Sequence, residues 1–373
     1  MQIIPVHTPK LLRQFITLPY QIYGENPLWT PPLRLEQKKM FTRSKNIVLQ
    51  KCPHQLYIVK QDDTCLARAA VYIDDHYNDY WQEETGFFGS FECVYDDRVA
   101  KALLATCEKW LSEHGCKSIR GPINFESQNW GFVCDGFNFS SRIMAPFNPP
   151  YYNDLVVNCG FVKAKDLDVY GAHVADYEIP ERFKRHKERL IQKYHLTVRS
   201  IRMNKLVDDV RIILDLNNRS VAGNWGVAPV SLDEAEKIAR DLKTIVRPDL
   251  ILIIEAQGEP IAFLIVLPEI YTAMKDLKGR LFPFGLLRLM TRLKKISEFR
   301  FWALGVVPEY QRRGIDSLLY LTIYEILHKQ DVYVEANYIL EDNFAMKDAV
   351  LKLGMQKVRT YRVYEKQISA PEG

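Results

Sequence analysis

The residues QRRG, at positions 311–314, stand where an apolar run changes into an amphipathic pattern. The run before them, 298–307, is typical of a buried strand, and the residues after them repeat apolar side chains at the helical period. The first N–H groups of a helix have no partner within it, and the helix dipole makes that end attractive to anions. Gly314 permits close approach of a ligand to the backbone, and Arg312 and Arg313 add charge-assisted hydrogen bonds. The stretch predicts a phosphate site.

The elements that would position this site occur twice. Gly160–Tyr170 and Gly354–Tyr364 share the pattern glycine, apolar, x, lysine, x, basic, and both close on Val-Tyr. At nearly the same offset, 57–73 parallels 252–268, and each is a strand pair around a polar turn. Two similarities at one offset indicate two copies of a supersecondary pattern.

Each copy predicts a hairpin, a third strand, a long amphipathic helix, a fourth strand, a helix ending at glycine and a closing strand. The helices after the third strands are expected at 97–113 and 314–328, with the boundary between copies near Pro180. We therefore predict an α/β protein, of the α+β mixed-sheet kind, with domains at 1–178 and 179–373.

Composition restricts the class of protein. The chain has 373 residues, 47% of them hydrophobic and 26% charged, with a net charge of +4, so disorder and a general affinity for nucleic acid are not indicated. The most apolar stretch, 251–270, contains Glu255 and Glu259 and reads as a hairpin. The seven cysteines have no zinc-site spacing and suit buried thiols. With no signal peptide or transmembrane pattern at hand, a cytoplasmic protein is expected.

The segment Leu304–Leu319 resembles motif A of the GNAT acetyltransferase superfamily, V-x-P-x-x-[QR]-x-x-G-x-[GA]. The matching residues are Val306, Pro308, Gln311 and Gly314. The resemblance continues through VEANYILEDNFAMKDAVLKLGM, where Asn343 and Ala345 open a helix that stops at Gly354. The whole chain is similar to a bacterial group of two-domain GNAT-like proteins, on the segments FITLPYQIYGENPLWTPPL and NPPYYNDLVVNCGF.

This resemblance implies two tandem GNAT-like acyl-CoA N-acyltransferase domains, with acetyl-CoA or another acyl-CoA held by the second. An amine of a small molecule or peptide would attack the thioester, while a strand N–H binds its carbonyl oxygen. The implied cofactor-binding residues are Leu304, Val306, Gln311, Arg312, Arg313, Gly314, Ile315, Asp316, Asn337 and Asn343. Asn343 is alternatively a helix N-cap.

An attacking amine must lose a proton, so a base is expected. Strand periodicity places Glu335 on the same face as Asn337, which makes Glu335 the candidate base; the alternative is a carboxylate paired within the sheet. Tyr338 is the candidate acid, or else an ordinary half-buried tyrosine. Two departures from the family favour lapsed catalysis: Val350 replaces the usual acid tyrosine, and Asp316 brings negative charge where the family has glycine or alanine.

The first copy lacks the phosphate loop, since Val99 stands where the second has Gly314, beside Asp96 and Asp97. It has instead a long connection, 121–152, rich in asparagine and aromatic residues. Connections of this length are usually functional or disordered, and the aromatic content argues against disorder. We expect either an interdomain packing loop or an acceptor-substrate site. The polar contacts of that site would be Glu126, Asn129, Trp130 and Asp135.

Two basic segments remain. In 279–300, apolar residues share one helical face among basic ones, which suits a helix packed on the sheet with a basic outer face or a peripheral membrane helix. The first is the commoner arrangement and is expected. The helix at 181–193 is expected to be a solvated surface helix.

Three functions stay open: an acyl-CoA-dependent N-acyltransferase, a CoA-binding or interaction protein that has lost catalysis, and an aminoacyl-tRNA-dependent transferase of similar tandem fold. The third depends only on the basic helix, and it would bind tRNA with steep salt dependence. Nucleic acid is the less favoured partner. The sequence does not identify the acceptor.

Overall fold

A computed structural model of the chain describes residues 1–125, 129–281, 284–293 and 295–368. Two compact units are formed. Unit 1 comprises Met1–Leu167, Tyr271–Thr291 and Arg359–Gly373; unit 2 comprises Asp168–Ile270 and Arg292–Val358. The sequence analysis expected contiguous domains divided at residue 178, whereas each unit is assembled from separate stretches of chain.

Unit 1 contains a mixed sheet in the order β1-β2-β3-β4-β5-β13, with β6 also paired to β13. The pairs from β1 to β4 are antiparallel, β4 and β5 are parallel, and β13 is antiparallel to β5. The strands are β1 (Gln2–Pro5), β2 (His54–Gln61), β3 (Thr64–Tyr72), β4 (Thr85–Cys93), β5 (Ser118–Gly121), β6 (Phe132–Asp135) and β13 (Gln356–Gln367).

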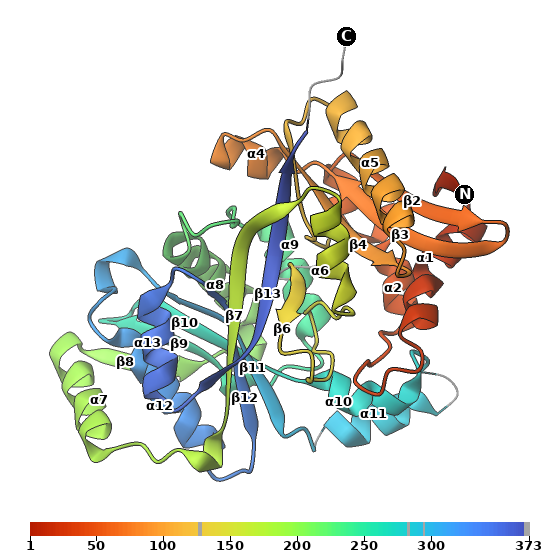
Figure 1. The fold of residues 1–373 in the computed structure, drawn as a ribbon. Coiled ribbons are helices and arrows are strands. Elements are labelled where there is room, and N and C mark those ends of the chain that lie inside the picture. Colours follow the sequence, from red (N-terminus) through yellow and green to blue (C-terminus); the bar gives the residue numbers. More distant parts are fainter. Residues whose placement is uncertain (126–128, 282–283, 294, 369–373) are drawn as a thin grey trace. The chain divides into compact units, whose positions relative to one another are not determined.

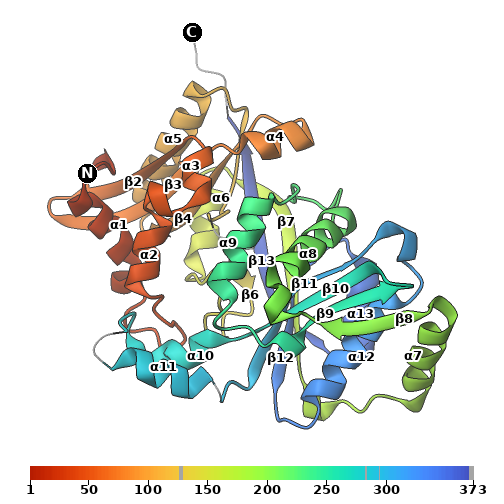
Figure 2. The same ribbon diagram turned by 180° about the vertical axis from the view of Figure 1, so that it is seen from behind.

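Helices cover both faces of this sheet (Figures 1 and 2). Alternation along β3 explains the two layers, because Ala69 and Val71 join the core under α5 while Arg68 reaches the carbonyl oxygen of Phe15 in α1. The helices are α1 (Pro9–Ile22), α2 (Arg34–Met40), α3 (Ile47–Lys51), α4 (Asp75–Trp81), α5 (Asp97–Glu113), α6 (Tyr151–Asn158), α10 (Ile270–Met274) and α11 (Gly285–Leu293).

Unit 2 repeats the strand order, β8-β9-β10-β11-β12 and then β7. The pairs from β8 to β11 are antiparallel, and β11 and β12 are parallel. The strands are β7 (Val162–His173), β8 (Leu196–Ser200), β9 (Ile251–Ala256), β10 (Glu259–Pro268), β11 (Glu298–Val306) and β12 (Tyr333–Leu340). The helices are α7 (Glu181–Tyr194), α8 (Leu206–Ser220), α9 (Leu232–Leu242), α12 (Ile315–Leu327) and α13 (Phe344–Lys352). In Figures 1 and 2, α8 lies on the face of this sheet opposite α12. The predicted fold class is confirmed.

The closing strands are exchanged. β13, the last strand of the chain, pairs with β5 of unit 1 through Tyr364↔Gly121 to Gln367↔Ser118. β7, which ends the first copy in sequence, neighbours β12 in unit 2, and the N–H of Val174 just after it donates to the carbonyl of Val332 at 2.9 Å. Each copy of the pattern therefore completes the sheet that the other copy begins.

The helix α11 differs from its expected packing. Its Leu289 and Leu293 are half-buried, but Leu286 and Met290 from the same predicted apolar face are exposed. The expectation that this face packs on the sheet is therefore wrong for its outer half. No helix among the described residues is long and apolar enough to cross a membrane.

Candidate functional site

The QRRG stretch forms a tight loop between β11 and α12. Pro308 starts a single 3-10 turn after the strand, and the Gln311 side chain turns back so that its Nε2 donates to the carbonyl oxygen of Val306 at 2.9 Å. Arg312 and Gly314 both have left-handed backbone, with φ of 58° and 78°. A glycine tolerates this conformation at no steric cost, which explains its place directly before the helix. The loop that sequence predicted is thus held by its own glutamine.

The helix α7 packs beside this loop. A Cβ atom built on Gly314 would lie 3.1 Å from Nε2 of His186, and Leu190 of the same helix is buried. Lys187, which follows His186, joins α7 to α12, because its Nζ lies 2.6 Å from Oε2 of Glu325. Most of α7 is exposed, as expected. The face of α7 that carries His186 and Leu190, however, limits the space that a ligand would have beside Gly314. Sequence reasoning missed this role of His186, because α7 and the loop are far apart in the chain.

Asp316 occupies part of the anion site itself. Burial raises the pKa of its carboxyl, while the nearby backbone N–H groups of Asp316 and Ser317 and the proximity of His186 act in the opposite direction. The N–H of Ser317 itself donates to the carbonyl oxygen of Gly314 at 3.1 Å. A carboxylate of the protein therefore lies beside the donors that the sequence assigned to a phosphate.

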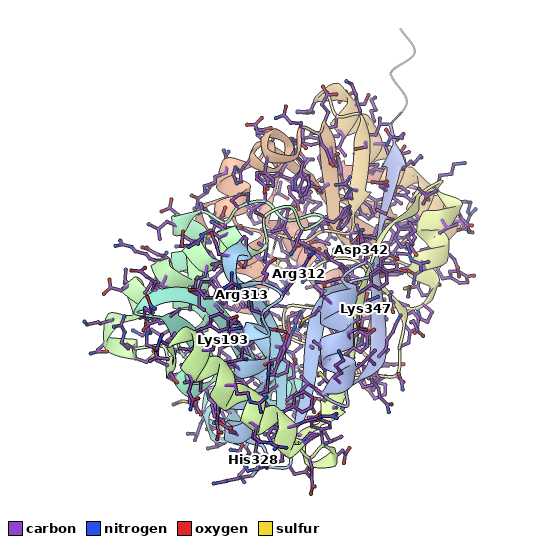
Figure 3. All side chains as sticks on the ribbon, turned by 90° about the vertical axis from the view of Figure 1, so that its left-hand side faces the viewer. Lys193, Arg312, Arg313, His328, Asp342 and Lys347 are labelled. Atoms are coloured by element: carbon purple, nitrogen blue, oxygen red, sulfur yellow. The ribbon has the colours of Figure 1, made fainter. Side chains whose placement is uncertain are left out.

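Positive charge gathers next to the loop. Arg312 and Arg313 are exposed, and the Arg313 guanidinium lies over the rings of Tyr310 and Tyr194, at 5.2 and 5.7 Å from their centroids. Nζ of Lys193 lies 5.0 Å from the centroid of the same Tyr194 ring. Figure 3 shows Lys193, Arg312 and Arg313 together on the side of unit 2 that faces the reader. The arrangement suits an anionic ligand with a flat ring.

The strands β11 and β12 part in the middle of the sheet. They pair in parallel from Glu298↔Tyr333 to Phe301↔Ala336, and no pairing continues although both strands run on. Beyond that point, residues 303–306 of β11 pair only with β10 on their other side. One edge of β11, which includes Leu304 and Val306, thus offers backbone groups to a ligand.

Two buried polar atoms lie where the strands part. Nε1 of Trp302 and Nδ2 of Asn337 are buried and have no hydrogen-bond partner among the described residues. The other end of the Asn337 amide is fixed, because Oδ1 accepts from Nε of Arg300 at 2.8 Å. A buried donor without a partner is costly, so these two groups are candidates for hydrogen bonds to a ligand. The role of Asn337 as a cofactor contact stays a prediction; Trp302 was not predicted.

The two candidate catalytic residues lie on β12. Glu335 is 2% exposed, and its position is paired with that of Arg300 on β11. Tyr338 is half-buried, with the Arg300 guanidinium 5.3 Å from its ring centroid. Glu335 does not reach solvent directly, which favours the alternative of a carboxylate held within the sheet. Neither role is tested by this geometry.

At the start of α13, Asn343 is an N-cap, since its Oδ1 accepts from the N–H of Met346 at 3.1 Å. Val350, at the family's acid position, is fully buried. The alternative N-cap role of Asn343 is therefore present in the structure.

Unit 1 offers no comparable loop at the corresponding place. Asp96 caps α5 by accepting from the N–H of Arg98 at 2.9 Å, and Arg98 pairs with the same carboxylate. The N-terminus of α5 is thus capped by an aspartate of the protein, at the place where an anion would bind.

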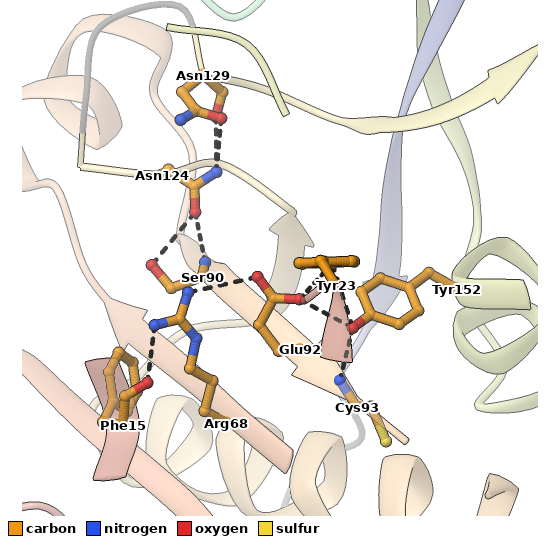
Figure 4. Close-up of polar contacts among 9 residues, drawn as sticks. All are labelled: Phe15, Tyr23, Arg68, Ser90, Glu92, Cys93, Asn124, Asn129 and Tyr152. Carbon is orange, nitrogen blue, oxygen red and sulfur yellow. Dashed lines mark hydrogen bonds and ion pairs between the residues drawn. The ribbon is translucent and has the colours of Figure 1, made fainter. Parts of the chain in front are cut away.

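A buried polar network occupies the end of β4 in unit 1 instead. Glu92 accepts hydrogen bonds from the hydroxyls of Tyr23 and Tyr152 and lies 3.4 Å from Nη2 of Arg68 (Figure 4). Burial raises the pKa of the Glu92 carboxyl, and Arg68 and the two tyrosines counteract this. All four side chains are buried, so the network stabilises the unit rather than facing a substrate.

The connection 121–152 contains the four predicted acceptor contacts. Glu126 lies outside the described residues. Asn129 accepts from Nδ2 of Asn124 at 2.9 Å, as Figure 4 shows, and Trp130 forms an antiparallel bridge with Ile123. Asp135, at the end of β6, is exposed. The contacts of Asn129 and Trp130 are those of a structured loop, and an acceptor role for these residues stays a prediction.

A small pocket does form in the same connection, within unit 1. Its lining includes Phe137, Phe139 and Phe147, together with Tyr361 and the buried Arg359 of β13. The Arg359 guanidinium lies 5.0 Å from the centroid of the Phe139 ring. The three predicted contacts that the structure describes, Asn129, Trp130 and Asp135, do not line this pocket.

Comparisons with known proteins bear on the family and the fold of the chain. No family model matches the chain. Over 366 residues, 96% of this chain and 93% of the relative, it is 30% identical to Protein YghO of Escherichia coli (strain K12). It is 27% identical to the Bacterial ceramide synthase of Caulobacter vibrioides (strain NA1000 / CB15N), over 99% of this chain and 98% of the relative.

Solved structures share the fold at low identity. A tandem GNAT protein from the clavulanic acid biosynthesis pathway superposes with a TM-score of 0.57 at 11% identity, covering 99% of this chain and 98% of that one. A GCN5-related N-acetyltransferase from Sphaerobacter thermophilus gives 0.53 at 12% identity, over 98% and 96%. The tandem GNAT fold inferred from the residues is thereby confirmed.

Proposed function

The chain belongs to the family of Protein YghO of Escherichia coli, and from this premise we propose that it is an N-acyltransferase that transfers an acyl group from a CoA thioester to an amine. The observation that carries the proposal is the parting of β11 and β12 beside the QRRG loop. An open strand edge and a phosphate-binding loop at consecutive positions are what a CoA thioester, with its pantetheine amides and its pyrophosphate, requires of a protein.

Different residues of unit 2 are proposed to bind different parts of the CoA thioester. The N–H groups at the start of α12, with Arg312 and Arg313, would hold the pyrophosphate. The free edge of β11 at Leu304 and Val306 would pair with the pantetheine amides, and Asn337 Nδ2 is a further donor at that edge. The Tyr194 and Tyr310 rings next to Arg313 suit the adenine of the same ligand.

For catalysis, the N–H groups along the parted edge of β11 are proposed to bind the thioester carbonyl oxygen as negative charge develops on it. Glu335 remains the proposed base, acting through water because its side chain is buried. Tyr338 remains the proposed acid in place of the tyrosine that Val350 replaces.

The acceptor class is proposed from a relative. The name Bacterial ceramide synthase is that of a protein 27% identical over 99% of this chain. A ceramide is an amide of a long-chain amino alcohol, so long-chain amines are the first acceptors to test, ahead of polyamines and peptides. The acyl chain could equally be acetyl or longer, and the donor is tested at the same time.

The experiment incubates the full chain with acetyl-CoA or palmitoyl-CoA and one amine from each class, and detects N-acyl products by mass spectrometry and thiol release. We expect an amide product and stoichiometric CoA with at least one pair. The control is a variant with Gly314→Glu. Thiol release without amide in every pair, or amide formation that is unchanged in the control, contradicts the proposal.

A second candidate is a CoA-binding protein without catalysis. Two observations favour it: the carboxylate of Asp316 lies beside the N–H groups of the loop, and Val350 is buried at the acid position. This candidate predicts CoA binding by calorimetry with no turnover of any acyl-CoA.

A further inference from the structure

The helix α11 and the residue before it expose large apolar side chains. Phe284 is 69% exposed, Leu286 48%, Leu287 67% and Met290 59%. Leu286 and Met290 are one helical turn apart with Leu287 beside them, so they form one stripe. The opposite flank is anchored, because Gly285 is buried and a Cβ there would lie 2.7 Å from the carbonyl oxygen of Arg280. A helix held on one flank thus presents an apolar stripe outward.

The surroundings of the stripe are basic. From residue 277 to residue 297 the sequence contains no aspartate or glutamate. Arg280 and Arg288 are exposed, and Arg292 follows Arg288 by one turn. Long basic side chains beside exposed leucine, methionine and phenylalanine can lie along an apolar surface with their charges in water.

The helix α2 extends the same surface. The N–H of Arg34, its first residue, donates to the carbonyl of Gly279 at 3.1 Å, and Figures 1 and 2 both show α2 near the α10–α11 segment. Leu35 is 57% exposed, and Lys38 and Lys39 are exposed on the following turn. Gly279, the named residues of α2 and the apolar stripe all belong to unit 1. One of these lysines is paired on α2 itself, because Nζ of Lys39 lies 2.9 Å from Oε1 of the exposed Glu36. Lys38 is thus the lysine that α2 adds beside Leu35.

We propose that this α11 surface, made of Phe284, Leu286, Leu287, Met290, Leu35 and the neighbouring basic residues, binds peripherally to membranes that contain anionic phospholipids. The apolar stripe enters the boundary between headgroups and acyl chains, and the arginines and lysines contact lipid phosphates. The helix lies in the plane of the interface and does not span the bilayer.

Charge favours this occupant over a second copy of the chain. Two copies joined through this face would bring basic residues against basic residues without acids of the segment 277–297 to balance them, which is unfavourable. An anionic bilayer satisfies both the apolar stripe and its charges. The inference stands independently of the proposed function, because it uses no residue of the QRRG loop or of β11 and β12.

The test is flotation of the full chain with vesicles of phosphatidylcholine alone or with about a third phosphatidylglycerol, at low and high salt. We expect binding to the anionic vesicles only, weakened by salt. Leu287→Ser with Met290→Ser should lower the bound fraction roughly tenfold or more, because two large side chains no longer enter the interface. Arg288→Gln with Arg292→Gln should weaken binding to anionic vesicles.

The matched control is Val157→Ser, which removes an apolar side chain that is 53% exposed on α6 of the same unit and should bind like the unchanged chain. All substituted positions apart from Arg292 are exposed, and equal thermal unfolding would establish that the variants are folded. Equal binding to neutral vesicles, or unchanged binding of the serine double variant, would overturn the proposal. The proposal would also be overturned if the unchanged chain does not float and forms a dimer that the serine double variant does not form. That result assigns the surface to a second copy of the chain.

Discussion

Asp316 is the residue at which this chain departs most from a simple phosphate loop. Its carboxylate lies beside the N–H groups of Asp316 and Ser317, at the helix start where a pyrophosphate would bind. A ligand anion at this helix start must therefore compete with a charge of the protein, and the raised pKa of Asp316 shows that burial already disfavours that charge.

We predict that Asp316→Ala binds CoA more tightly than the unchanged chain, roughly tenfold, because one repulsive charge and one competitor are removed. As the pH falls through the raised pKa of Asp316, the unchanged chain gains affinity and the difference shrinks. Calorimetry at several pH values measures this, with Asp331→Ala, an exposed acid of unit 2, as control. Equal affinity at all pH values would show that Asp316 does not face the ligand.

Glu92 gives a second prediction at this scale. Its pKa is raised in the folded protein, so above the ordinary value of 4.5 the unfolded chain releases a proton that the folded chain retains. The contribution of Glu92 to the free energy of unfolding is therefore largest below that pH, and it decreases as the pH rises through the pKa of the folded protein. Glu92→Gln, which keeps an oxygen for Tyr23 and Tyr152, should lose this dependence. Urea unfolding of both proteins across pH 4 to 8 tests it, and parallel profiles would contradict it.

At the scale of helices and strands, sequence patterns predicted an element correctly where the residues of that segment determine its structure. The helix α5 spans Asp97–Glu113 as expected, because an aspartate N-cap precedes a long apolar period. The loop before α12 was likewise predicted from Pro308 and Gly314. The partner of Gly314 was not, since His186 comes from a helix whose sequence signals only an exposed basic face.

The start of α12 yields a prediction on binding. Gly314→Glu should lower CoA affinity roughly a hundredfold, because it adds a negative side chain at φ 78° beside His186, at the place where phosphates must approach. Calorimetry of the unchanged chain should give one CoA per chain, since α5 of unit 1 is capped by Asp96. Gly115→Ala, at φ 85° with open space around it, is the control for backbone strain alone. Two sites per chain, or a glutamate variant that binds normally, would show that the loop has another role.

The strand β12 carries the prediction on catalysis. If Glu335 takes the proton of the amine, Glu335→Gln lowers kcat/KM roughly a hundredfold while CoA affinity stays nearly unchanged. A single-turnover assay with an accepted amine, together with calorimetry, separates the two quantities. Because Glu335 is buried opposite Arg300, thermal unfolding is measured in parallel. Lost stability with an unchanged rate would assign Glu335 to the sheet alone.

At the scale of the molecule, the sequence predicted the repeat but not the exchange of its closing strands. The segments that become β7 and β13 have similar patterns, Gly160–Tyr170 and Gly354–Tyr364, so nothing in either one specifies which sheet it completes. Only the pairing of β13 with β5, and of β7 beside β12, distinguishes exchanged from contiguous domains. The predicted cut at residue 178 consequently separates each unit from its last strand.

This exchange predicts how fragments behave. Residues 1–178 alone lack β13 and leave the edge of β5 unpaired from Ser118 to Gly121, while residues 179–373 alone lack β7 beside β12. Unpaired edges next to a buried core aggregate, so each fragment expressed by itself should be insoluble, and co-expression of the two should give a soluble complex. Size-exclusion chromatography of the co-expressed fragments measures this. A pair divided after Gly160, which leaves β7 with the second fragment instead, is the comparison. If the fragment 179–373 alone is soluble, monomeric and cooperatively folded, unit 2 does not need β7, and the exchanged arrangement is contradicted.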